Sequence, residues 1–151
     1  MNSLENELVG ALIGFGATVT DAMNAEPGFI PCGNPAAMVT KGLLLVNSDA
    51  SEEALTKQVA LTKNFIAHVS EHHGGTPHPV ADATTLNADQ LALLDELKTV
   101  AASMQKVEEH HPEVFNWVYR SLASLEPNSS EDFAKLSGRA EKMKAHAASL
   151  A

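Results

Sequence analysis

Apolar side chains that recur every three or four residues limit the fold of this chain more than any other feature. In residues 51–79 the recurring positions are Leu55, Val59, Thr62, Ile66, Val69 and His73. Alternating steps of four and three place side chains on one stripe of an α-helix. A second row on the adjacent shoulder comprises Gln58, Leu61, Phe65, His68 and His72. So wide an arc predicts a helix with at least two packing neighbours, ending at Gly74 and Gly75.

The same spacing predicts three more long helices and two short ones. The long helices are expected over residues 2–24, over residues 87–111, and from Ser129 or Ser130 to Leu150; the short ones are expected over 36–46 and 112–125. Residues 36–46 are also compatible with a strand, but no other segment offers a strand to pair with. We therefore predict an all-α helical bundle of four long helices plus two short helices, folded as a single domain over residues 1–151.

Three pairs of residues have the spacing of a capping box, in which each side chain satisfies a free backbone N–H of the first helical turn. The pairs are Asn2 with Glu5, Asp49 with Glu52, and Asn87 with Gln90. They predict where the three longest helices begin.

The first predicted helix contains three glycines, Gly10, Gly14 and Gly16. A glycine inside a helix costs about 1 kcal/mol relative to alanine, so these positions need a compensating gain. We expect that gain to be the close approach of a neighbouring helix. A closely bound ligand or dimer partner is the alternative.

Charge and cysteine content restrict the partners and the location. The formal net charge is −9, with ten Lys and Arg against 19 Asp and Glu, which argues against nucleic acid as a partner. The single cysteine excludes an intrachain disulfide, and residues 1–40 lack the basic start of a secretory signal. The apolar run Leu8–Val19 is shorter than the about 20 residues that cross a bilayer. We expect a cytoplasmic protein with no membrane partner.

Histidines near the end of the central helix are candidate metal ligands. His68 and His72 are four residues apart, so their imidazoles share one helical face and can share an ion, and His78 lies close enough in sequence to join them. The sequence thus predicts a transition-metal site at His68, His72 and His78. The alternative, which we favour, is that the doublets at 72–73 and 110–111 stabilise helix C-termini through the macrodipole.

Two further groups of residues are candidates for chemistry or contact. Cys32 precedes a predicted helix start, where the N-terminal dipole can make a thiol reactive, although burial as a small apolar residue is the reading we favour. Trp117 and Tyr119 lie on successive faces of a short helix. We therefore expect at least one of them to be exposed and available to a partner.

No catalytic signature accompanies these residues. The sequence has no glycine-rich phosphate loop, no Gly-x-Ser-x-Gly and no His-Glu-x-x-His, so whether it is an enzyme stays open. We predict a small acidic helical bundle that acts as a binding or assembly module for a protein partner or for itself as a homodimer. The alternative function is a transition-metal-binding bundle that uses the His-x-x-x-His pair.

Overall fold

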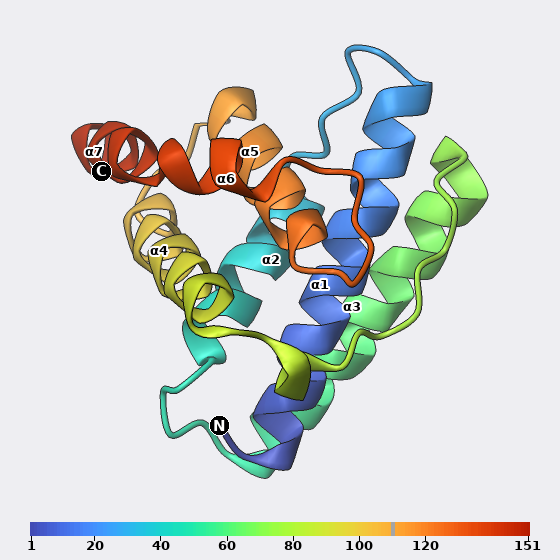
Figure 1. The fold of residues 1–151 in the computed structure, drawn as a ribbon, viewed down its shortest axis with the longest axis vertical. Coiled ribbons are helices and arrows are strands. Elements are labelled where there is room, and N and C mark those ends of the chain that lie inside the picture. The colour runs from blue at the N-terminus through green and yellow to red at the C-terminus, as the bar shows by residue number, and fades with distance from the viewer. Residues whose placement is uncertain (110) are drawn as a thin grey trace.

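The computed structural model describes residues 1–109 and 111–151, and all regular structure in this part of the chain is helical (Figure 1). Helices comprise 71% of the chain, with no strand among the described residues. The elements are α1 (Ser3–Ala25), α2 (Asn34–Leu45), α3 (Glu52–His73), the 3₁₀ turn η1 (Ala83–Thr85), α4 (Ala88–Met104), α5 (Pro112–Ser124), α6 (Phe133–Gly138) and α7 (Ala140–Leu150). The predicted all-α bundle is confirmed, and residues 34–45 are helix rather than strand.

The first helix, α1, is the centre of the bundle. Helices α3 and α5 pack along its sides, α2 and η1 also contact it, and α7 packs on α4 further out (Figure 1). Every residue from Leu8 to Thr20 is buried. The predicted capping box of Asn2 and Glu5 begins the helix, with each side chain accepting from the other residue's backbone N–H.

The apolar run Leu8–Val19 belongs to a longer helix than the run itself suggests. By length and hydropathy, the 23 residues of α1 suffice to cross a membrane. Yet 83% of the most apolar window is buried inside the fold. The core helix of a bundle requires such burial, so the length of α1 is weak evidence for a membrane span.

One glycine of α1 admits a helix, as predicted. A Cβ atom on Gly16 would lie 2.5 Å from the Cβ of Leu122 on α5. Real Cβ atoms do not approach so closely, so α5 can occupy its place only because position 16 has no side chain. The helix cost of Gly16 is therefore offset by tight packing of α1 against α5.

The other two glycines of α1 admit a loop instead of a helix. A Cβ atom on Gly10 would lie 2.1 Å from the carbonyl oxygen of Ala81, and one on Gly14 would lie 2.7 Å from that of Pro79. The Ala81 N–H donates to the Gly10 carbonyl at 3.1 Å. We call this contact of Gly10 and Gly14 with residues 75–81 the α1–loop seam. The expectation of a neighbouring helix is wrong here, because extended backbone fills the space.

Helix α4 ends earlier than predicted. It begins with the expected capping box of Asn87 and Gln90 but ends at Met104. The apolar spacing predicts that it continues to His111. The backbone then tightens, because Val107 N–H donates to the Met104 carbonyl. The next helix begins with Pro112, and a proline disfavours helical conformation in the residue before it.

The prediction of a fourth long helix is wrong, because this segment is divided into α6 and α7 at Arg139. It begins at Phe133, with Asp132 rather than Ser129 or Ser130 as its cap. In a continuous α-helix the Leu136 carbonyl would accept a hydrogen bond from the backbone N–H four residues later. Here it accepts from the Trp117 indole N–H at 2.9 Å and from the backbone N–H of Arg139. This tighter turn ends α6.

The ends of α3 are set by one predicted and one unpredicted residue. Gly74 ends the helix in the left-handed conformation, with φ of 72°, as expected. At the start, however, Ser51 is the cap and accepts from Ala54 N–H at 3.1 Å. The predicted capping box is wrong because Asp49 lies in a turn with φ of 58°.

Candidate functional site

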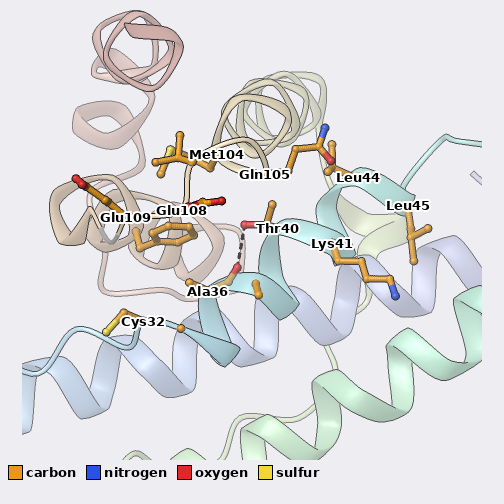
Figure 2. Close-up of a pocket in the computed structure, with 14 residues that line it drawn as sticks. Cys32, Ala36, Thr40, Lys41, Leu44, Leu45, Met104, Gln105, Glu108 and Glu109 are labelled. Carbon is orange, nitrogen blue, oxygen red and sulfur yellow. Dashed lines mark hydrogen bonds between the residues drawn. The ribbon is translucent and has the colours of Figure 1, made fainter. Parts of the chain in front are cut away.

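An open cleft separates α2 from the end of α4 and the turn that follows it (Figure 2). Its volume is about 590 Å³, within the roughly 300–1,000 Å³ range of sites that bind small molecules or side chains. The lining comes from residues 32–45, residues 104–109 and Phe115. We call this space the α2–α4 cleft.

The early end of α4 creates the α2–α4 cleft. Beyond Met104 the chain turns instead of continuing as a helix beside α2. Opposite it, α2 presents the short side chains of Ala36, Ala37 and Thr40 to the cleft. The Thr40 hydroxyl donates to the Ala36 carbonyl at 2.8 Å, so its hydrogen bonding is satisfied within its own helix. Short side chains facing a turn leave the space open.

The two ends of the α2–α4 cleft differ in charge. Glu108, Glu109 and Cys32 gather at one end in Figure 2, and Lys41 and Leu44 lie toward the other. Glu108 and Glu109 are exposed, and neither pairs with a cation among residues 1–109 and 111–151. The cleft therefore combines a largely apolar lining with two exposed carboxylates at one end.

Cys32 is exposed and lines the α2–α4 cleft. The favoured prediction of a buried cysteine is wrong, because the preceding carbonyl rather than the thiol is tied to the core. Pro31 O accepts a hydrogen bond from the buried Tyr119 hydroxyl at 2.8 Å. Gly33, with φ of 68°, then turns the chain into α2. The thiol is accessible as a reactive group requires, and its reactivity stays a prediction.

The aromatic pair of α5 is buried, so the prediction that one of them is exposed is wrong. Trp117 is 3% exposed and Tyr119 is 0% exposed. Each has its polar atom satisfied, by Leu136 O and Pro31 O respectively. Burial, with a smaller effect of Cys32, raises the pKa of Tyr119. Both residues anchor neighbouring segments to α5 and offer no surface to a partner.

The structure brings together two of the three predicted metal ligands. The rings of His68 and His72 lie side by side on α3, with centroids 4.5 Å apart. His78 has both ring nitrogens against carboxylates, Nε2 at 2.6 Å from Asp21 and Nδ1 at 2.8 Å from Glu126. Among the described residues, no three His, Cys, Asp or Glu side chains are placed to hold a metal ion. The predicted set of three is not assembled.

The helix-end reading of the doublets can be followed at one doublet. His72 and His73 lie in the last turn of α3, where that explanation requires them. The His73 ring also stacks on Phe29, with centroids 4.0 Å apart. At the other doublet, His110 lies outside the described residues. The prediction is wrong for His111, because α4 ends at Met104 and His111 is instead the residue that precedes the first turn of α5.

The protonation of His78 follows from its two carboxylate neighbours. Burial lowers the pKa of His78, but the hydrogen bond to Asp21 and the charges of Glu126 and Asp21 outweigh it. The pKa therefore lies above its ordinary value of 6.5. A protonated ring carries an N–H on each nitrogen and can donate to both carboxylates.

Sequence reasoning missed the cleft because it placed Glu108 and Glu109 inside a continuous helix. The one available signal was Pro112, which marks a break shortly after them.

Comparison of the chain with protein-family models, curated proteins and solved structures finds no match.

Proposed function

We propose that this protein is a binding module that docks a basic, amphipathic peptide segment of a partner protein in the α2–α4 cleft. One observation carries the proposal: an open, largely apolar cleft of about 590 Å³ has two exposed carboxylates at one end, and neither is paired with a cation in the described part of the chain. Helical peptides that dock in grooves bury an apolar face and leave charged residues at the rim.

The apolar part of the cleft supports the docking of side chains. Leu44, Met104 and Phe115 contribute large apolar groups to the lining, and Ala36 and Ala37 leave room beside them. Burial of apolar surface contributes about 25 cal/mol per Å², so a few inserted side chains suffice for measurable affinity.

The charge of the chain favours a basic partner over a second copy. Each copy carries a net charge of −9, so two acidic surfaces would repel where the rim already has Glu108 and Glu109. The argument for a homodimer is also weaker in the structure, because both sides of α1 are covered within one chain.

We place the protein in the cytoplasm, where the exposed thiol of Cys32 stays reduced.

Fluorescence anisotropy with a labelled Leu/Lys amphipathic peptide of about 14 residues tests the proposal. We expect binding that weakens about tenfold in the double variant Glu108→Gln with Glu109→Gln, since two rim ion pairs contribute about 1.4 kcal/mol together. Ala37→Trp fills the cleft and should abolish binding.

A matched control removes the same charge elsewhere. Glu52 and Glu53 are adjacent, exposed glutamates at the start of α3 that do not line the cleft. Glu52→Gln with Glu53→Gln should leave the affinity within about twofold. Equal weakening by both double variants, or binding that survives Ala37→Trp, contradicts the proposal. A chain that binds no peptide but dimerises in light scattering supports self-association instead.

The pair His68 and His72 favours a second candidate function, binding of a transition metal with water in the remaining positions. Elemental analysis of untagged protein after dialysis against zinc tests it. We expect bound zinc that is lost in His68→Ala and kept in His146→Ala, a histidine on another helix. Absence of zinc, or equal retention by both variants, rejects this function.

A further inference from the structure

The chain between α3 and α4 runs along α1 and is attached to it by its backbone. The N–H of His78 donates to the Thr18 hydroxyl at 3.0 Å, and that of Ala81 donates to the Gly10 carbonyl. The backbone of Gly75 is so close that a Cβ atom would lie 2.6 Å from the Thr18 carbonyl. Residues 75–81 thus form a cover over the glycine-bearing side of α1.

One side chain of the cover, that of His78, joins three segments. Its ring lies between Asp21 of α1 and Glu126, which follows α5, at 2.6 and 2.8 Å. The side chain of His78 is 22% exposed, so water screens these contacts only in part. Carboxylates accept hydrogen bonds, and two short contacts of this kind need two N–H donors on one ring.

We propose that residues 75–81 are a pH-dependent cover of α1, latched by protonated His78 and released when His78 loses its proton. A neutral imidazole has a single N–H, so its second nitrogen would direct a lone pair at a carboxylate. Loss of one proton therefore replaces an attractive contact with a repulsive one. Opening uncovers the strip of α1 around Gly10 and Gly14, which nothing else in the described chain covers as closely.

The carboxylates that face His78 come from three segments. Asp21 faces it from α1, Glu126 from the end of α5 and Glu131 from the following turn. The guanidinium of Arg120 is bound to Glu131 at 3.5 Å. Asp21 and Glu126 favour the protonated ring and outweigh the opposing effect of burial, so the pKa of His78 lies above 6.5.

The sign of the pH dependence follows from that direction. A histidine with a raised folded-state pKa stabilises the closed cover fully below pH 6.5, and this contribution is lost as the pH rises through the higher folded-state value. The cover therefore opens more often once the pH has risen through the folded-state pKa of His78.

Amide hydrogen exchange measured by NMR tests the latch on the full chain. We expect the protection factor of the Ala81 amide to fall on the order of tenfold between pH 5.5 and pH 8.5, as loss of a charge-assisted hydrogen bond implies. The amide of Leu97, in the core of α4, should keep its protection factor. In His78→Gln the Ala81 protection should be low and independent of pH.

His146→Gln is the matched control, because His146 also contacts a carboxylate, Glu113 at 3.0 Å, on a different part of the surface. It should keep the full pH response of Ala81. A pH response that persists in His78→Gln, or an Ala81 protection that does not vary with pH in the unmodified chain, overturns the proposal. If His78→Gln does not fold, Glu126→Gln replaces it and must reduce the response.

Discussion

The α1–loop seam and the α2–α4 cleft are two places where non-helical chain passes beside a helix, and only one of them is closed. At the seam, Gly10 and Gly14 let the backbone of residues 75–81 come into contact with α1. At the cleft, the turn after Met104 leaves a space of about 590 Å³ beside α2. Both helices have small residues at the contact, so side-chain size alone does not decide the outcome.

The difference lies in hydrogen bonding by the passing chain. The loop of the seam donates from Ala81 N–H to α1 and from His78 N–H to the Thr18 hydroxyl. The turn after α4 instead satisfies its amides locally, as Lys106 and Val107 donate to Ser103 and Met104. A segment with satisfied backbone groups has no need to approach its neighbour. Closure therefore requires both room and an unsatisfied donor.

The largest expected effect on stability comes from adding a side chain to α1 at the α1–loop seam. Gly10→Ala should lower the free energy of unfolding by about 3 kcal/mol, since a clash with the Ala81 backbone exceeds the about 1 kcal/mol gained in helix propensity. Urea denaturation followed by circular dichroism measures it. Gly138→Ala is the control, because no atom lies within 4 Å of its added Cβ. A stable Gly10→Ala would break the contrast between seam and cleft.

A smaller effect is expected where a single hydrogen bond holds one edge of the cleft. Tyr119→Phe removes the donor to Pro31 O and should cost about 1–2 kcal/mol, because a buried carbonyl loses its partner. The loop carrying Cys32 should then move. We expect faster reaction of the Cys32 thiol with a maleimide, and an unchanged rate would show that the edge is held by packing instead.

The smallest effect on stability should come from placing a large side chain in the α2–α4 cleft. Ala37→Trp occupies the cleft without displacing packed atoms and should change the free energy of unfolding by no more than about 0.5 kcal/mol. The same urea denaturation measures it. A loss of several kcal/mol would mean that α2 and α4 pack more tightly than an open cleft allows.

Local patterns in the sequence predict what depends on local chemistry. The capping boxes at Asn2 and Asn87 and the left-handed Gly74 form as expected, because each needs only neighbours within a few residues. The apolar spacing likewise predicts the all-α class and the buried row from Leu55 to Val69.

Features set by contacts between distant residues were not predictable. The division of the last helix at Arg139 depends on the Trp117 indole reaching Leu136, and the burial of Tyr119 depends on a partner 88 residues away, Pro31. The candidate site shows the same limit. The pair His68 and His72 follows from helical spacing, whereas His78 is drawn away by Asp21 and Glu126.

The enclosed position of α1 has a consequence for synthesis of the protein. α1 is translated before α3 and α5, the two helices that pack along it, and α5 ends at Ser124. After α1, roughly 100 more residues must therefore be synthesised before α3 and α5 can both pack against it, which takes about 5–20 s at ordinary elongation rates. During that interval α1 lacks the helices that bury 83% of its most apolar window in the folded chain.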